Sequence, residues 1–305
     1  MTVFVLGITY HSRMFKQLFA IIAPIIICAG IGYLWARKGI DYPVNFVTRL
    51  VMNIGAPCLI LSSFSRADID IGKMAEVSAA TVIVLLIMLI LGSLLIRVMR
   101  LKVSTFLPSL LFPNIGNMGL PVCLFAFGET GLALGLTVFL VIFTLQMSLG
   151  ILLSAGRGNL VGLVRQPVLW ATAVAVTLVA TGSSLPVWLD NTTGILGGAT
   201  IPLMLVTLGV SLAQLKVADW KHSLLFSLVR VLGGFGLAVI VAGLLGLEGV
   251  DRGVLILQSS MPVAVFNYLL ALRYQREPGE VAGMVVISTL LAFALLPLIV
   301  SFILA

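Results

Sequence analysis

The sequence predicts an all-α integral membrane protein with ten transmembrane helices arranged as two inverted five-helix repeats. Its 305 residues are 60% hydrophobic and only 10% charged, with a mean hydropathy of +1.20, whereas soluble domains carry about 25% charged residues. Apolar runs of about 18 residues or more, the length that spans a bilayer, recur along the whole chain. Similar segments also recur five spans apart. Together these observations exclude an ordinary soluble globule.

Ten apolar stretches are expected to cross the membrane, and the loops between them are too short to hold a second domain. The three cysteines, Cys28, Cys58 and Cys123, lie in apolar segments without zinc-ligand spacing, so we interpret them as core residues. The expected spans are 15–36, 43–64, 74–99, 104–128, 130–154, 166–184, 187–213, 220–246, 251–272 and 280–304.

The basic residues are distributed unevenly between the two sides of the expected bundle. Of the 18 Lys and Arg residues, twelve follow odd-numbered spans, five lie on the opposite side, and Arg230 lies inside a span. Because cytoplasmic loops carry an excess of Lys and Arg, both termini are expected outside. We recognise no signal peptide, and Met14 offers a second plausible start besides Met1. The twelve are Arg37, Lys38, Arg49, Arg97, Arg100, Lys102, Arg157, Arg165, Lys216, Lys221, Arg273 and Arg276.

An internal repeat divides the chain. The segment "LVMNIGAPCLIL" (50–61) is similar to "ILGGATIPLMLV" (195–206), and each belongs to the second span of its half. Because five spans separate equivalent positions, the second copy must insert upside down, and inverted repeats with interrupted helices are typical of transporters. We expect residues 1–155 to form the first repeat and residues 156–305 the second.

Proline residues are expected to break the fourth and ninth spans. The stretch "FPNIGNMGLP" (112–121) places prolines, glycines and asparagines inside an apolar span. A proline frees the carbonyl four residues earlier, which belongs to Asn117 for Pro121 and to Gln258 for Pro262. Such groups are tolerated at membrane depth only where protein or a wet cavity satisfies them. A single proline is explained as well by a plain kink that amide side chains repair.

The two breaks together favour one shared substrate cavity, because Ser259, Ser260 and Asn267 add further polar groups at the second break. Half-helices that begin near the two prolines would aim positive dipole ends at the cavity, where a carboxylate fits. Arg230 is expected to attract the same carboxylate, and the alternative is snorkelling to the cytoplasmic face. Asn53, Gln146 and Thr207 are equally consistent with bridging helices or with touching a ligand.

The expected function is secondary transport of a small organic anion by alternating access. An intramembrane enzyme would need a nucleophile with a base, or a metal centre, at depth. No histidine or carboxylate lies at the midplane, so we expect no catalytic residue, cofactor or metal ion. A channel would need continuous polarity along a pore, whereas polarity here is concentrated at one level. Sodium-coupled symport stays open as an alternative, and no nucleic-acid partner is expected.

The order and spacing of these segments over nearly the whole chain resemble the auxin efflux carrier family of membrane transport proteins. That family includes bacterial permeases and the plant PIN-type exporters. The similar segments are "LVMNIGAPCLIL", "PNIGNMGLPVCLFAFGETG", "LGGATIPLMLVTLGVSL", "LVRVLGG" around Arg230, and "SSMPVAVFNYLLALRYQ" followed by "STLLAFALLPL".

The resemblance implies ten helices with crossing breaks in the fourth and ninth. It implies a scaffold domain from helices 1, 2, 6 and 7, a transport domain from helices 3–5 and 8–10, and elevator-like movement. It also implies organic anion substrates such as malate, malonate or indole-3-acetate, the inner membrane of a bacterium, and a possible homodimer. Asn114, Asn117 and Asn267 are the substrate contacts it suggests. The related sodium–bile acid symporters use an acidic residue near the second crossing, where this chain has Gln258, Ser259 and Ser260.

Overall fold

The computed structural model describes residues 2–66, 70–156 and 164–304, and every regular element within these ranges is helical. The prediction of an all-helical chain is thereby confirmed. In the first half the elements are α1 (Thr2–Arg37), α2 (Val44–Leu50), η1 (Val51–Gly55), α3 (Ala56–Arg66), α4 (Ile71–Val98), α5 (Val103–Leu111), η2 (Ile115–Gly119), α6 (Leu120–Leu145), η3 (Gln146–Gly150) and α7 (Ile151–Ala155), where η marks a short π-helical stretch. In the second half they are α9 (Pro167–Thr181), α10 (Val187–Gly198), α11 (Thr200–Gln214), α12 (Trp220–Leu228), η4 (Val229–Gly233), α13 (Gly234–Leu245), α14 (Gly249–Ser259), α15 (Val265–Arg273) and α16 (Pro278–Leu304).

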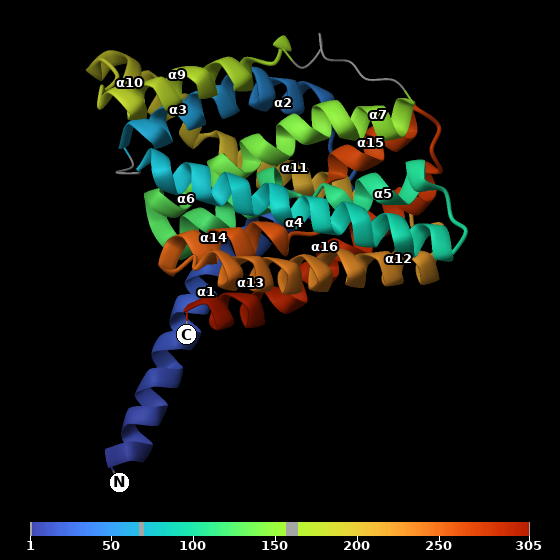
Figure 1. The fold of residues 1–305 in the computed structure, drawn as a ribbon, viewed down its shortest axis with the longest axis horizontal. Helices are drawn as coiled ribbons and strands as arrows, with labels where there is room; N and C mark the ends of the chain where they lie inside the picture. The colour runs from blue at the N-terminus through green and yellow to red at the C-terminus, as the bar shows by residue number, and fades with distance from the viewer. Residues whose placement is uncertain (1, 67–69, 157–163, 305) are drawn as a thin grey trace.

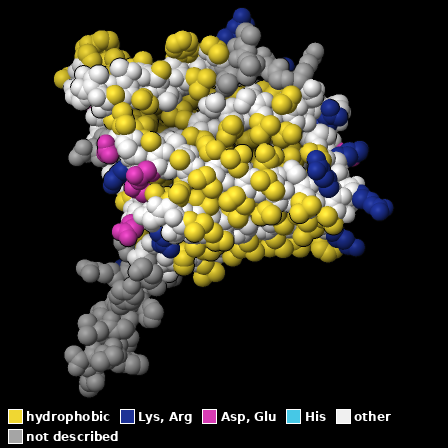
Figure 2. All heavy atoms as spheres, viewed as in Figure 1, with side chains coloured by type: hydrophobic (Ala, Val, Ile, Leu, Met, Phe, Trp, Pro, Cys, Tyr) yellow, Lys and Arg dark blue, Asp and Glu magenta, His cyan; other side chains and the backbone are white. Residues whose placement is uncertain are grey.

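Seven helical stretches within the described ranges are long and apolar enough to cross a membrane. Large apolar side chains are exposed on their outer faces, as at Ile90 and Leu94 of α4, and hydrophobic side chains cover much of the face in Figure 2. So much exposed apolar surface is stable in lipid and not in water. The seven are Leu18–Arg37, Val44–Arg66, Ile71–Val98, Ile115–Ala155, Val187–Gln214, Trp220–Leu245 and Pro278–Leu304.

The stretch Ile115–Ala155 folds back on itself at Gly128. Its 41 residues would extend about 60 Å as one straight helix, roughly twice the thickness of a hydrocarbon core. Gly128 has φ 65° and ψ −153°, a backbone conformation that is essentially restricted to glycine. A Cβ placed on Gly135 would lie 3.3 Å from the Cβ of Cys123, whereas a straight helix would hold those positions about 18 Å apart. The stretch therefore consists of two helical arms packed together.

The prediction that the first break lies at Pro121 is wrong. The chain leaves helical geometry at residues 112–114, around Pro113, between α5 and η2. Pro121 lies instead at the start of α6, which continues directly from η2, so its missing N–H falls inside a continuous helical stretch. The π-helical bonds before it, such as the Leu120 N–H to the Ile115 carbonyl, widen the turn that leads into the proline. The second break contains Pro262, as predicted.

The helices pack in two groups. α1 packs against α11, and α3 packs against α9 and α10. In the other group, α12 packs against α16, α14 against α6 and α13, and α4 against α5 and α13. Figure 1 shows α3, α9 and α10 along one edge and α12, α13 and α16 along the opposite edge. α11 also contacts η2, so the first break lies where the two groups meet.

Candidate functional site

The two helix breaks cross and pair through their backbones. The Asn114 N–H donates to the Pro262 carbonyl at 2.6 Å, and the Ala264 N–H donates to the Phe112 carbonyl at 3.2 Å. Backbone groups released from each broken helix are therefore satisfied by the other break. The segments that carry them come from opposite halves of the chain, so the crossing joins the two halves directly.

Between these two bonds, Pro113 and Val263 face each other as an isolated antiparallel bridge. Residues at such a non-hydrogen-bonded position offer no N–H to the opposite segment, so proline costs nothing at Pro113. The Val263 N–H points the other way and donates to the hydroxyl of Ser288, on α16, at 2.9 Å. Pairing with the second break thus explains why the chain breaks at Pro113 and not at Pro121.

Two of the four half-helices present their C-terminal ends to the crossing, and the other two present their N-terminal ends. α5 and α14 end at it, whereas η2, which continues into α6, and α15 begin at it. A helix carries about +0.5 elementary charge at its N-terminus and about −0.5 at its C-terminus. The crossing therefore presents two positive helix ends on one side and two negative ends on the other.

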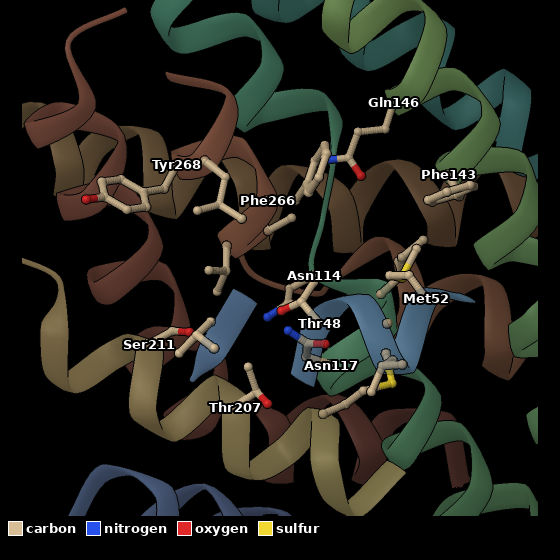
Figure 3. A pocket seen from close by; sticks show the side chains of 18 of the residues that line it. Thr48, Met52, Asn114, Asn117, Phe143, Gln146, Thr207, Ser211, Phe266 and Tyr268 are labelled. Atoms are coloured by element: carbon tan, nitrogen blue, oxygen red, sulfur yellow. The ribbon is translucent and has the colours of Figure 1, made fainter. Parts of the chain in front are cut away.

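A cavity of ≈ 230 Å³ lies against the positive ends. α2, η1 and α11 line it on one side, and the starts of η2 and α15, together with α6 and η3, line it on the other. Its apolar lining includes Phe139, Phe143 and Met204, and none of the described lining residues is charged. The polar lining includes Thr48, Asn114, Asn117, Gln146, Thr207 and Ser211 (Figure 3).

Asn114 and Asn117, both predicted from the sequence, lie together in this lining (Figure 3). Asn114 is only 4% exposed, and its Nδ2 is buried without a hydrogen-bond partner among the residues that the structure describes. An unpaired buried polar group costs about 1–3 kcal/mol, which an acceptor bound in the cavity would offset. Asn117, one helical turn further on, is partly buried.

Asn267 lies behind the lining and orients one of its members. Its Nδ2 donates to the Phe112 carbonyl at 2.9 Å, and its Oδ1 accepts from Gln146 Nε2 at the same distance. Gln146 itself lines the cavity. Asn267 therefore joins the second half-helix both to the first break and to a lining side chain, with both Nδ2 and Oδ1 hydrogen-bonded.

The other predicted residues also lie outside the cavity lining. Gln258 Nε2 donates to the Gly135 carbonyl at 3.3 Å, and the Ser260 hydroxyl donates to the Ile256 carbonyl at 2.6 Å. Both side chains are fully buried, and Gln258 Oε1 has no hydrogen-bond partner among the described residues. The predicted residues that do not line the cavity are Pro121, Arg230, Gln258, Ser259, Ser260, Pro262 and Asn267.

Arg230 is buried, as its place inside a span predicts, but its guanidinium contacts protein backbone. Nη1 donates to the Leu110 carbonyl and Nη2 to the Ser259 carbonyl. Leu110 lies in the last turn of α5, and Ser259 is the last residue of α14. The structure thus places Arg230 at the negative ends of the half-helices, and not in the lining where a substrate carboxylate would meet it.

Four polar lining residues were not predicted: Thr48, Ser211, Gln214 and Tyr268. A signal for two of them is present in the sequence, because Thr207, Ser211 and Gln214 follow the i, i+4, i+7 spacing of one helix face. For Thr207, bridging and ligand contact were both open, and the structure shows a bridging contact. Thr207 lines the cavity, and its Oγ1 lies 2.8 Å from the Tyr42 hydroxyl.

One group of possible metal ligands lies elsewhere in the described chain. Ligand atoms of Asp219, His222 and Glu280 are within 4.8 Å of one another. Asp219 is the N-cap of α12, and the hydrogen bond from the Lys221 N–H lowers the pKa of its carboxyl. His222 Nδ1 lies 3.0 Å from Asp219 Oδ2. These contacts fit a helix cap, and none of the three residues lines the cavity.

Comparison with known proteins gives the family of this chain. A family model described as "Membrane transport protein" matches residues 18–161 and 152–300. An uncharacterized transporter of Methanothermobacter thermautotrophicus is 28% identical over 295 residues, which cover 90% of this chain and 94% of the relative. An uncharacterized transporter of Methanocaldococcus jannaschii is 25% identical over 285 residues, or 87% and 92% of the two chains. This multi-pass membrane protein therefore belongs to the membrane transport protein family, which is of the auxin efflux carrier type.

Proposed function

We propose that this transporter carries a small organic anion with a carboxylate group through the cavity at the crossing. The observation that carries the proposal is an uncharged cavity that combines two positive half-helix ends with the unpaired Nδ2 of Asn114. Helix N-termini bind anions through free N–H groups and the helix dipole. Phe139 and Phe143 line the same cavity and suit the organic body of such an anion.

The cavity is formed between the two packing groups, which favours alternating access of the elevator type. α2, η1 and α11 supply one wall, and the crossing supplies the other. We infer a scaffold from the spans that contain α1, α2–α3, α9 and α10–α11, and a transport unit from the remaining spans. Sliding the transport unit along the scaffold would expose the cavity to each side in turn.

Ten spans in two inverted repeats are the simplest topology for this arrangement. Asn117 and Asn267 support the repeat, because each follows its own bridge residue, Pro113 or Val263, by four positions. The two broken helices then occupy equivalent places in residues 1–155 and 156–305. The two arms that meet at Gly128 would be the fourth and fifth spans.

The charge distribution supports an orientation with both termini outside. Most of the Lys and Arg side chains visible in Figure 2 lie at one end of the molecule, whereas the plainly visible Asp and Glu side chains lie at the other end beside a few basic ones. By the positive-inside rule the basic end faces the cytoplasm in the cell's inner, or plasma, membrane. Arg157, one of the twelve residues behind this expectation, lies outside the described residues.

The cavity faces the basic end. Thr48 lies soon after Arg37 and Lys38, and Gln214 closely precedes Lys216. The wall formed by the scaffold therefore comes from helix segments next to the basic loops. We interpret this conformation as open toward the cytoplasm. Sodium coupling finds no support here, because the described lining has no carboxylate for the ion.

Uptake into proteoliposomes tests the proposal. Purified protein would be assayed with labelled malonate, malate and indole-3-acetate, with and without a sodium gradient. We expect saturable uptake of at least one anion, independent of sodium. Asn117→Leu should raise its KM about tenfold or more, since a hydrogen bond to a charged group contributes about 1.5–3 kcal/mol.

Asn53→Leu is the matched control, because Asn53 is an exposed amide outside the cavity lining. It should keep the KM of the unchanged protein. Absence of uptake for all three anions would contradict the proposed substrate class. Equal kinetics for the two Leu variants would show that the cavity at the crossing is not the anion site.

A further inference from the structure

Arg230 joins the two half-helices that run into the crossing from behind the cavity. It is 2% exposed and lies in η4, between α12 and α13. Its guanidinium donates to the carbonyl of Leu110 at the end of α5 and to that of Ser259 at the end of α14. The two acceptors belong to opposite halves of the chain, and a third element holds them together through one side chain.

The positive charge of Arg230 is balanced by the two helix ends that it contacts. Each helix C-terminus carries about −0.5 elementary charge, so the two ends together carry about −1, which one guanidinium neutralises. None of the ion pairs among the described residues involves Arg230. A buried charge is costly unless it is paired and hydrogen-bonded. Here the helix ends supply the opposite charge and accept from Nη1 and Nη2, while Nε has no partner among the described residues.

We propose that Arg230 is a positioning residue of the transport site, and that it fixes the C-terminal ends of α5 and α14 against each other. Because η2 and α15 continue from the same two breaks, this contact also fixes the positive ends that face the cavity. The importance of that alignment for anion binding rests on the proposed function. The contact itself is a property of the crossing and can be tested without substrate.

Gly234 provides the space for this contact. A Cβ on Gly234 would lie 1.9 Å from the Ser259 oxygen and 2.4 Å from Arg230 Nη2, so any larger residue must displace one of them. Gly236 lies on the same helix, α13, and a Cβ there would meet nothing within 4 Å. Gly234→Ala and Gly236→Ala therefore form a matched pair that disturbs or spares the contact without changing any charge.

Hydrogen–deuterium exchange of the full chain, read by mass spectrometry without added anion, tests the role. Peptides that cover residues 105–120 and 255–270 report on the N–H groups of Asn114 and Ala264. Both residues line the cavity, so opening of the crossing would let water reach them. Arg230→Met should raise exchange about tenfold or more in both peptides, the size expected for loss of charged hydrogen bonds. Arg230→Lys should give an intermediate increase, because it keeps the charge and loses the planar fork.

Gly234→Ala should raise exchange in the same two peptides, and Gly236→Ala should not. This pair of variants tests the proposal even if Arg230→Met fails to fold. Peptides from α9 and α10, which pack against α3 away from the crossing, serve as the reference. Unchanged exchange at the crossing in Arg230→Met, an increase in only one of the two peptides, or an equal increase in the reference peptides would overturn the proposal. Because no transport is measured, the outcome is independent of whether the chain carries an anion.

Discussion

The backbone N–H of Asn114 donates to the carbonyl oxygen of Pro262 at 2.6 Å. The bond joins the breaks of two helices from opposite halves of the chain. It satisfies the backbone of Asn114 and leaves the side-chain Nδ2 unpaired within the described structure, beside the cavity. The same residue therefore stabilises the crossing with its backbone and offers a donor to a ligand with its side chain.

Asn114→Leu separates these two roles. The backbone bond to Pro262 is kept, and an unpaired buried amide is removed, so the free energy of unfolding should stay the same or rise by about 1 kcal/mol. Anion uptake should weaken through a higher KM. Thermal unfolding in detergent and initial uptake rates measure the two effects. A variant that loses stability and retains its KM would contradict this division of roles.

The two prolines of the first break should differ in importance. Pro121→Ala should change the unfolding free energy by less than about 1 kcal/mol and largely preserve uptake, because the π-helical turn before Pro121 already accommodates its ring and its missing N–H. Pro113→Ala should reduce uptake more, because it frees φ at the bridge to Val263. It should also lower the free energy of unfolding by about 0.4–1 kcal/mol, because the unfolded chain gains conformational entropy. The uptake rates of the two variants are compared. A lower rate for Pro121→Ala than for Pro113→Ala would show that Pro121 is the more important proline of the first break.

The bond between Gln146 and Asn267 should couple the two residues energetically. Gln146→Leu leaves Asn267 Oδ1 buried without its donor and should lower the unfolding free energy by about 1–3 kcal/mol. The double variant with Asn267→Leu should cost less than the sum of the single changes. Gln214→Leu, at an exposed lining amide, is the control for loss of an amide alone. Additive single and double changes would show that the bond contributes nothing.

Cysteine labelling tests the orientation. In a variant without Cys28, Cys58 and Cys123, we introduce Lys216→Cys at the basic end or Ser184→Cys at the opposite end, both at exposed positions. An impermeant maleimide added outside intact cells should label Ser184→Cys and leave Lys216→Cys unlabelled, because the basic end faces the cytoplasm. The reverse pattern would invert the proposed topology.

Long apolar stretches could be predicted because a bilayer requires about 20 apolar residues per helix, and seven of them are helices in the described chain. Their arrangement as ten spans stays a prediction. The existence of the first break could also be predicted from its prolines, glycines and asparagines. Its position could not. The choice between Pro113 and Pro121 depends on pairing with Val263, a partner from the other half that no local pattern reveals.

The residues of the site likewise divide into those that could be predicted from the sequence and those that could not. Asn114 and Asn117 could be predicted as lining residues because they sit at the break itself. The burial of Arg230 also followed from its depth in a span, but its partners did not, because backbone carbonyls leave no mark in a sequence. The expectation of a carboxylate partner considered only the positive helix ends, whereas two negative helix ends together balance one guanidinium.

The most direct test of the account is anion uptake by Asn117→Asp in proteoliposomes. The change is isosteric and places a carboxylate at the start of the first half-helix, where it would take the place of the substrate anion at the positive ends. Asn117→Ser, which is neutral, separates loss of the amide from gain of the charge. We predict that Asn117→Asp lowers uptake at least about tenfold below Asn117→Ser, since like charges repel in a site of low dielectric. Uptake by Asn117→Asp at the rate of the unchanged protein would contradict anion binding at the crossing.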